Sequence, residues 1–178
     1  QSDYRRRLAG FMAGWFLLNL LQAAFTELNP DEAYYWAYSR ELGWGYFDHP
    51  PMIALMIRIG SALLPGELGV RFVTVLLSTG SIWLLWLLAG RPHTRSDQNT
   101  LLLLFAAMPM LQVYAFVATP DSPLLFFSLL FFFVYDRFVR QGTWGNTLLL
   151  GAVMAAMLYS KYHGILVIGF TVLSDLRL

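Results

Sequence analysis

The sequence has no cysteine, which excludes a disulfide framework, a thiolate zinc site and a cysteine nucleophile. Charged residues are also scarce, at 13% of the 178 residues. This is about half of the share that a soluble domain usually carries. The net charge is only +1, and the sequence shows no basic tract with interleaved aromatic residues, so nothing indicates a nucleic-acid partner.

Apolar residues are abundant: they make up 57% of the chain, and aromatic residues make up 16%. A soluble domain of this size could not bury so much apolar surface, and the excess requires lipid as its solvent. Trp and Tyr side chains suit the two membrane–water interfaces. The composition therefore predicts an all-α integral membrane protein.

Charge-free stretches indicate where the chain crosses the membrane, because a helix needs about 20 apolar residues to span the bilayer core. These stretches are residues 8–26, 72–90, 100–118, 122–135, 141–160 and 164–174. The fourth is long enough if Thr119, Pro120 and residues 137–139 extend it, and the sixth only if it begins near Ser160. We therefore expect about six transmembrane helices in a single domain over residues 1–178.

The uneven distribution of Lys and Arg among the loops indicates the orientation. If the loops alternate from a cytoplasmic N-terminus, eight basic residues lie inside, namely Arg5, Arg6, Arg7, Arg91, Arg95, Arg137, Arg140 and Arg177. Four lie outside, namely Arg40, Arg58, Arg71 and Lys161. The acidic residues show the opposite bias, with seven outside and four inside. The one long loop, residues 27–66, is therefore expected on the outer face of the membrane.

Two short helices are expected within this outer loop. Residues 31–42 follow a polar turn, with Asn29 or Asp31 as the helix cap. Residues 52–64 follow Pro50-Pro51, which suit the first turn of a helix. An apolar stretch of this length is more often interfacial than spanning. We interpret both segments as helices that lie at the membrane surface.

Four polar clusters stand at the outer ends of the expected helices: Asn29–Glu32, Gly45–Pro51, Ala118–Pro123 and Ser160–Gly164. Helix caps, a rigid turn and a Lys that extends to the interface would explain them without any function. Acids and an imidazole at the membrane surface could also supply a general base or bind phosphate or a metal. By spacing alone, Asp48 and His49 are too few for a metal site. In the six-span topology all four clusters meet at one face.

Several motifs follow one another along the chain, namely Asp31–Trp36, Gly45–Pro51, Glu67–Phe72, Thr119–Asp121 and Ser160–Tyr162. Their combined order resembles the GT-C superfamily of integral membrane glycosyltransferases. The most similar branch is the bacterial one related to protein O-mannosyltransferases and to aminoarabinose transferases of lipid A. Members of this branch are longer, so the resemblance implies the N-terminal part of a larger module in a bacterial inner membrane. We expect such a part to be inactive alone.

The resemblance implies a sugar donor carried on a polyprenyl phosphate and an acceptor that is a lipid, a glycan or a protein. The catalytic acidic motif of the family falls on Asp31, with Glu32 beside it, and the second acidic position falls on Asp121. The family's tyrosine falls on Tyr35 and its basic position before the sixth helix on Lys161. These residues are the first candidates for a site at the periplasmic or extracellular face.

A further motif of the family, an aromatic–acid–base turn before two prolines, falls on Tyr46, Asp48 and His49. Related enzymes often have Glu-Lys where this chain has Asp48-His49. The leaving group would be a lipid phosphate, whose charge cations or a divalent metal ion should neutralise. His49, Arg58 and Lys161 are the candidate cations, and Asp48 is the candidate metal ligand. Asp31 could accept the proton of the acceptor hydroxyl, and a single displacement at the anomeric carbon would invert its configuration.

Two other functions are compatible with a helical membrane protein. A transporter would carry ionisable residues along a path through the middle of the membrane. Here the polar clusters gather at one face, which counts against transport. A structural or assembly subunit, with the outer loop as its binding surface, remains open at this stage. Binding of a polyprenyl-phosphate sugar would separate the enzyme from both alternatives.

Overall fold

The computed structural model describes residues 2–90 and 94–175, and all regular structure in these ranges is α-helical. The helices are α1 (Ser2–Phe25), α2 (Pro30–Arg40), α3 (Met52–Leu63), α4 (Gly66–Leu88), α5 (Arg95–Ala107), α6 (Pro109–Val113), α7 (Asp121–Arg140), α8 (Trp144–Ser160) and α9 (Gly164–Asp175). The predicted all-α membrane protein is confirmed.

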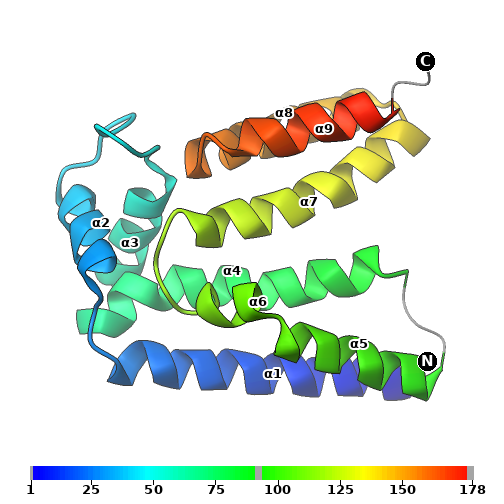
Figure 1. The fold of residues 1–178 in the computed structure, drawn as a ribbon, viewed down its shortest axis with the longest axis horizontal. Helices are drawn as coiled ribbons and strands as arrows, with labels where there is room; N and C mark the ends of the chain where they lie inside the picture. Colours follow the sequence, from blue (N-terminus) through cyan, green and yellow to red (C-terminus); the bar gives the residue numbers. More distant parts are fainter. Residues whose placement is uncertain (1, 91–93, 176–178) are drawn as a thin grey trace.

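The long helices form a row in which α4 packs between α1 and α7, and α8 packs on the other side of α7. Among the described residues, Arg5–Phe25, α4 and α7 are long and apolar enough to cross a membrane. The α5–α6 pair, α8 and α9 lie beside them, and successive segments run in alternating directions (Figure 1). At 1.5 Å per residue, α8 and α9 reach only about 26 Å and 18 Å.

Two expected spans differ from the observed helices. Residues 100–118 do not form one helix, because the chain breaks at Met108–Pro109 and α6 ends at Val113. Proline has no N–H to donate and clashes with the preceding turn, so the helix cannot continue through it. The last helix begins at Gly164, not near Ser160, since a turn over residues 161–163 separates it from α8. The fourth span, in contrast, extends at its C-terminal end as expected, to Arg140.

The two predicted helices of the loop 27–66 are present as α2 and α3, at the end of the bundle where α1 ends and α4 begins (Figure 1). Asn29 caps α2, as one of the two expected residues. The connection from α3 to α4 is very tight: a Cβ atom on Gly60 would lie 2.2 Å from the carbonyl oxygen of Gly69. Glycine at these positions allows the two backbones to touch and holds α3 against α4.

All four polar clusters lie at this same end of the bundle, which we call the polar end (Figure 1). Their shared location was predicted from the topology and is confirmed. The opposite end, which we call the basic end, holds Arg5, Arg6, Arg7, Arg95, Arg137 and Arg140. Arg91 and Arg177, which were also assigned to that side, lie outside the described residues. Which end faces the cytoplasm stays a prediction.

Candidate functional site

A buried ion pair organises the polar end. The side chain of Glu32 is fully buried and that of Arg71 is 2% exposed, and Arg71 Nη2 lies 2.5 Å from Glu32 Oε2. Arg71 Nε donates a second hydrogen bond to Glu32 Oε1, at 2.7 Å. The pair joins the first turn of α2 to the first turns of α4. Planar, bidentate Arg–carboxylate pairs are stronger than single contacts and fix geometry.

Both members of this pair use their full hydrogen-bonding capacity. Glu32 also accepts from the backbone N–H groups of Asn29 and Ala118, which makes four accepted bonds in all. A carboxylate offers about four acceptor positions, so none is left for a substrate. The other N–H groups of Arg71 donate to carbonyl oxygens of Ala23, Thr26 and Glu27 and to the Thr26 hydroxyl. The pair thus ties the end of α1, α2, α4 and the segment before α7 together.

A second ion pair joins two of the predicted site residues. Lys161 Nζ lies 2.8 Å from Asp121 Oδ1 and 2.9 Å from Oδ2, and both side chains are half-buried. Asp121 stands in the first turn of α7, and Lys161 follows the last residue of α8. The backbone N–H of Ala118 binds Glu32, three residues before Asp121. The buried ion pair therefore also positions this second pair.

Tyr35, His49 and Asp48 form a chain of polar contacts beside these pairs. The Tyr35 hydroxyl lies 3.2 Å from His49 Nε2, and the other ring nitrogen, Nδ1, lies 3.0 Å from Asp48 Oδ2. Hydroxyl groups of Tyr34 and Tyr38 donate to Asp48 Oδ1 at 3.1 Å and 3.0 Å. Each of these three side chains is therefore held by at least one neighbour, and these contacts orient the imidazole on the surface of α2.

The titration of these groups reports how closely the acids gather. Burial first, and then the negative charges of Asp31, Asp48 and Asp121, together raise the pKa of Tyr35 to about 12. The neighbouring His49 ring is the main cause that lowers the pKa of Asp48. Asp48 is therefore a carboxylate at neutral pH, and the Tyr35 phenol keeps its proton. The charges of three acids, from α2, the loop 41–51 and α7, thus all act on one phenol.

The remaining predicted residues take different places. Asp31 is exposed in the first turn of α2, one turn before Tyr35 on the same helix face. Tyr46 stacks on Tyr38 with ring centres 4.0 Å apart, and its hydroxyl donates to the Tyr38 and Glu41 carbonyl oxygens, so it shapes the loop. Arg58 is exposed on α3, and no contact joins it to the cluster in the part of the chain that the structure describes.

A metal ion does not fit the described side chains. Among residues 2–90 and 94–175, no three His, Asp or Glu side chains gather closely enough to hold one. Asp48 and His49 supply only two side chains, and the tyrosine hydroxyls already contact Asp48 Oδ1 and His49 Nε2. We therefore assign no step to a metal ion at Asp48.

An apolar cavity of about 500 Å³ lies at the polar end. Its walls are formed by the loop after α2, the start of α3 and the end of α8, and they include Leu42, Trp44, Pro51, Met52, Leu55 and Tyr159. Pro51 is two residues after His49, and Tyr159 is two residues before Lys161. The loop before α3 and the end of α8 therefore contribute both to the cavity wall and to the polar cluster, whereas the ionisable side chains of the cluster do not line the cavity.

Sequence reasoning identified Asp121 and Lys161 but missed the partnership of Glu32 with Arg71. Arg71 stood in one of the quoted motifs without a role. A signal was present, since an arginine just inside a long apolar helix requires a partner when it is buried. The partner could not be chosen among the several acids at the polar end, because helix periodicity gives the face of a residue but not the helix opposite it.

The comparisons with known proteins identify the family of the chain. Residues 48–174, well over half of the chain, match the model of the dolichyl-phosphate-mannose-protein mannosyltransferase family. No curated protein and no solved structure gave a match. The matched range contains Asp48, His49, Arg71, Asp121 and Lys161, that is, most of the cluster described above. The chain belongs to the dolichyl-phosphate-mannose-protein mannosyltransferase family, a family of GT-C type membrane glycosyltransferases.

Proposed function

We propose that the polar end binds a polyprenyl-phosphate-linked sugar and serves its transfer to a lipid, glycan or protein acceptor at the outer face of the membrane. The observation that carries this proposal is that a polar cluster and an apolar cavity lie at the same end of a membrane bundle, on the same loop and the same helix end. A lipid-linked sugar has the same two parts. Its phosphate and sugar require polar partners, and its tail requires an apolar surface that opens toward the bilayer.

Lys161 is the best placed cation for the phosphate. Its ammonium has three N–H donors, and the two oxygens of Asp121 account for two of them. The third can bind a phosphate oxygen while the ion pair is kept. The Tyr35 hydroxyl on α2 and His49 in the loop before α3 contact each other and can orient the sugar or its phosphate. Because Asp121 holds Lys161 on both carboxylate oxygens, the ammonium is positioned before the donor arrives.

Asp31 is the candidate general base. Its carboxylate is exposed at the start of α2, so an acceptor hydroxyl can reach it. It would take the proton from that hydroxyl while the oxygen attacks the anomeric carbon and the bond to the lipid phosphate breaks. The phosphate leaves with the bonding electrons, and the configuration at carbon inverts. Glu32, whose four acceptor positions are occupied, would instead hold α2 and the residues before Asp121 in place.

A transporter is less compatible with this arrangement. In the described ranges, the ionisable side chains of α1, α4, α7 and α8 lie toward the helix ends, and the polar groups buried midway along the α1–α4 interface, such as Trp15, Asn19 and Ser78, are uncharged. A transport path would place ionisable groups at mid-membrane depth.

Donor binding to the purified chain tests the proposal. The chain is reconstituted in lipid nanodiscs, and binding of a polyprenyl-phosphate mannose is compared with that of the polyprenyl phosphate without sugar. Lys161→Gln should weaken binding about tenfold or more, the range for a lost hydrogen bond to a charged group. Arg137→Gln, at the basic end, is the matched control and should bind like the unmodified chain. Equal binding by the Lys161→Gln and Arg137→Gln variants would contradict the proposed donor site.

A further inference from the structure

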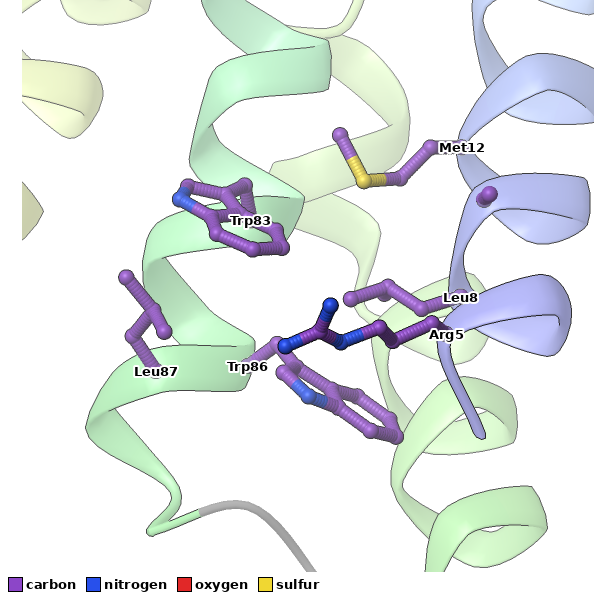
Figure 2. A pocket seen from close by; sticks show the side chains of 7 residues that line it. Arg5, Leu8, Met12, Trp83, Trp86 and Leu87 are labelled. Atoms are coloured by element: carbon purple, nitrogen blue, oxygen red, sulfur yellow. The ribbon is translucent and has the colours of Figure 1, made fainter. Parts of the chain in front are cut away.

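A second cavity lies at the basic end, far along the bundle from the candidate active site. It is formed between the first turns of α1 and the last turns of α4, and its volume is about 690 Å³ (Figure 2). Arg5 is the single charged residue of its lining, and Leu8, Met12, Trp83 and Trp86 form most of the rest. Nothing in the proposed reaction uses this cavity.

The walls combine an apolar floor with a cation at one side. Trp86 is 1% exposed and forms part of the core, whereas Trp83 is 47% exposed. Figure 2 shows the Arg5 side chain extending from α1 toward α4 beside Trp86, with Met12 one to two turns farther along α1. The arginine lies near the ends of the two helices, and Met12 lies deeper along α1. A phospholipid has the same order of parts, since its phosphate lies at the interface and its acyl chains lie deeper.

We propose that this cavity binds an anionic phospholipid of the adjacent leaflet. The Arg5 guanidinium would bind the lipid phosphate, and one acyl chain would lie along Met12 and Trp83. Charge complementarity supports this occupant, because Arg6 and Arg7 follow Arg5 at the same end and favour a negative headgroup over a zwitterionic one. Basic pockets between transmembrane helices are typical sites for anionic headgroups. The proposal does not depend on the transferase function of the polar end.

Native mass spectrometry of the whole chain, purified with mixed phosphatidylglycerol and phosphatidylcholine, tests the proposal. We expect one retained phosphatidylglycerol in preference to phosphatidylcholine. Arg5→Gln should weaken this retention about fivefold, which is the effect of one basic residue at an anionic surface. Arg137→Gln is the matched control, because Arg137 is also an exposed arginine of the basic end and lies on α7, outside the cavity lining, and it should leave the retention nearly unchanged.

Ala9→Trp provides an independent variant, since it fills the cavity from the exposed side of α1 without removing a charge. It should abolish retention of the lipid while thermal unfolding stays cooperative. Equal losses in Arg5→Gln and Arg137→Gln would overturn the proposal and indicate a general attraction to negative lipids. Equal retention of the two lipids, unchanged retention in Ala9→Trp, or a second copy of the chain seated on this face would also overturn it.

Discussion

The buried ion pair provides the sharpest test of how the polar end is built. Replacing Glu32 by Gln keeps the shape of the side chain and its place in the helix cap, because Gln also serves in a capping box. It removes the negative charge and turns one acceptor into an N–H group that faces the Arg71 Nη2 donor. Arg71, only 2% exposed, is then left as a buried charge without its partner.

The expected cost is large. Removing one partner of a buried, hydrogen-bonded pair lowers the free energy of unfolding by about 3–5 kcal/mol. Asp31→Asn makes the same chemical change one residue earlier, at an exposed side chain. It should change the free energy of unfolding by no more than about 0.5 kcal/mol. Removing both charges together, in Glu32→Gln with Arg71→Met, should cost less than the sum of the single changes, because no buried charge is left without a partner.

Denaturation by sodium dodecyl sulfate in mixed micelles, followed by far-ultraviolet circular dichroism, measures all four variants against the unmodified chain. We expect Glu32→Gln to lower the unfolding midpoint and Asp31→Asn to leave it unchanged. The double variant should lose less stability than the two single variants lose together. If Glu32→Gln unfolds at the same point as Asp31→Asn, the pair does not hold the polar end together, and its role in positioning Asp121 fails with it.

Three further predictions concern the outer loop and its support. A membrane-impermeant thiol reagent should label Gly43→Cys from the outside of intact cells, and labelling only after permeabilisation would reverse the topology. Gly69→Ala should lower stability by about 1–3 kcal/mol, because its Cβ would lie 2.1 Å from the Leu64 carbonyl oxygen; an unchanged melting midpoint would show that α3 and α4 can separate. The carboxyl group of Asp48 should titrate below its ordinary value of about 3.9 in ¹³C NMR and rise in His49→Ala. Because folding lowers this pKa, the contribution of Asp48 to stability is complete above the pKa of the unfolded chain and is lost as the pH falls through the pKa of the folded chain. A titration midpoint of Asp48 at or above about 3.9 would refute the prediction.

The sequence predicted the architecture well where hydrophobicity decides it. Helix positions followed from charge-free stretches, and the common location of the polar clusters followed from alternating the loops. The break at Pro109 was missed because the count of charges ignored a residue that carries none yet cannot donate a backbone hydrogen bond. The Asn29 cap was predicted as one of two candidates because it depends on neighbours within a few residues.

The site was predicted less completely because its contacts join distant parts of the chain. The sequence placed Lys161, Asp31 and Asp121 at one end of the bundle without choosing which acid partners the ammonium, and the structure pairs Lys161 with Asp121. The choice of Glu32 for Arg71 depends on how α2 sits on α4, which local pattern does not contain. Glu32 was grouped with the catalytic acids because it adjoins Asp31, yet a rotation of about 100° between neighbours in a helix sends one carboxylate to solvent and the other to the core.

The proposed division of roles between these two acids is the central claim, and transfer of labelled sugar from a polyprenyl-phosphate donor tests it most directly. In a complete enzyme that carries this segment, Asp31→Asn should lower turnover by about 10²–10⁴-fold, the usual effect of losing a general base. Donor binding and unfolding midpoint should stay near those of the unmodified enzyme, because Asp31 is exposed. Near-normal turnover in Asp31→Asn would contradict the account, above all if Glu32→Gln, folded and binding donor normally, were inactive.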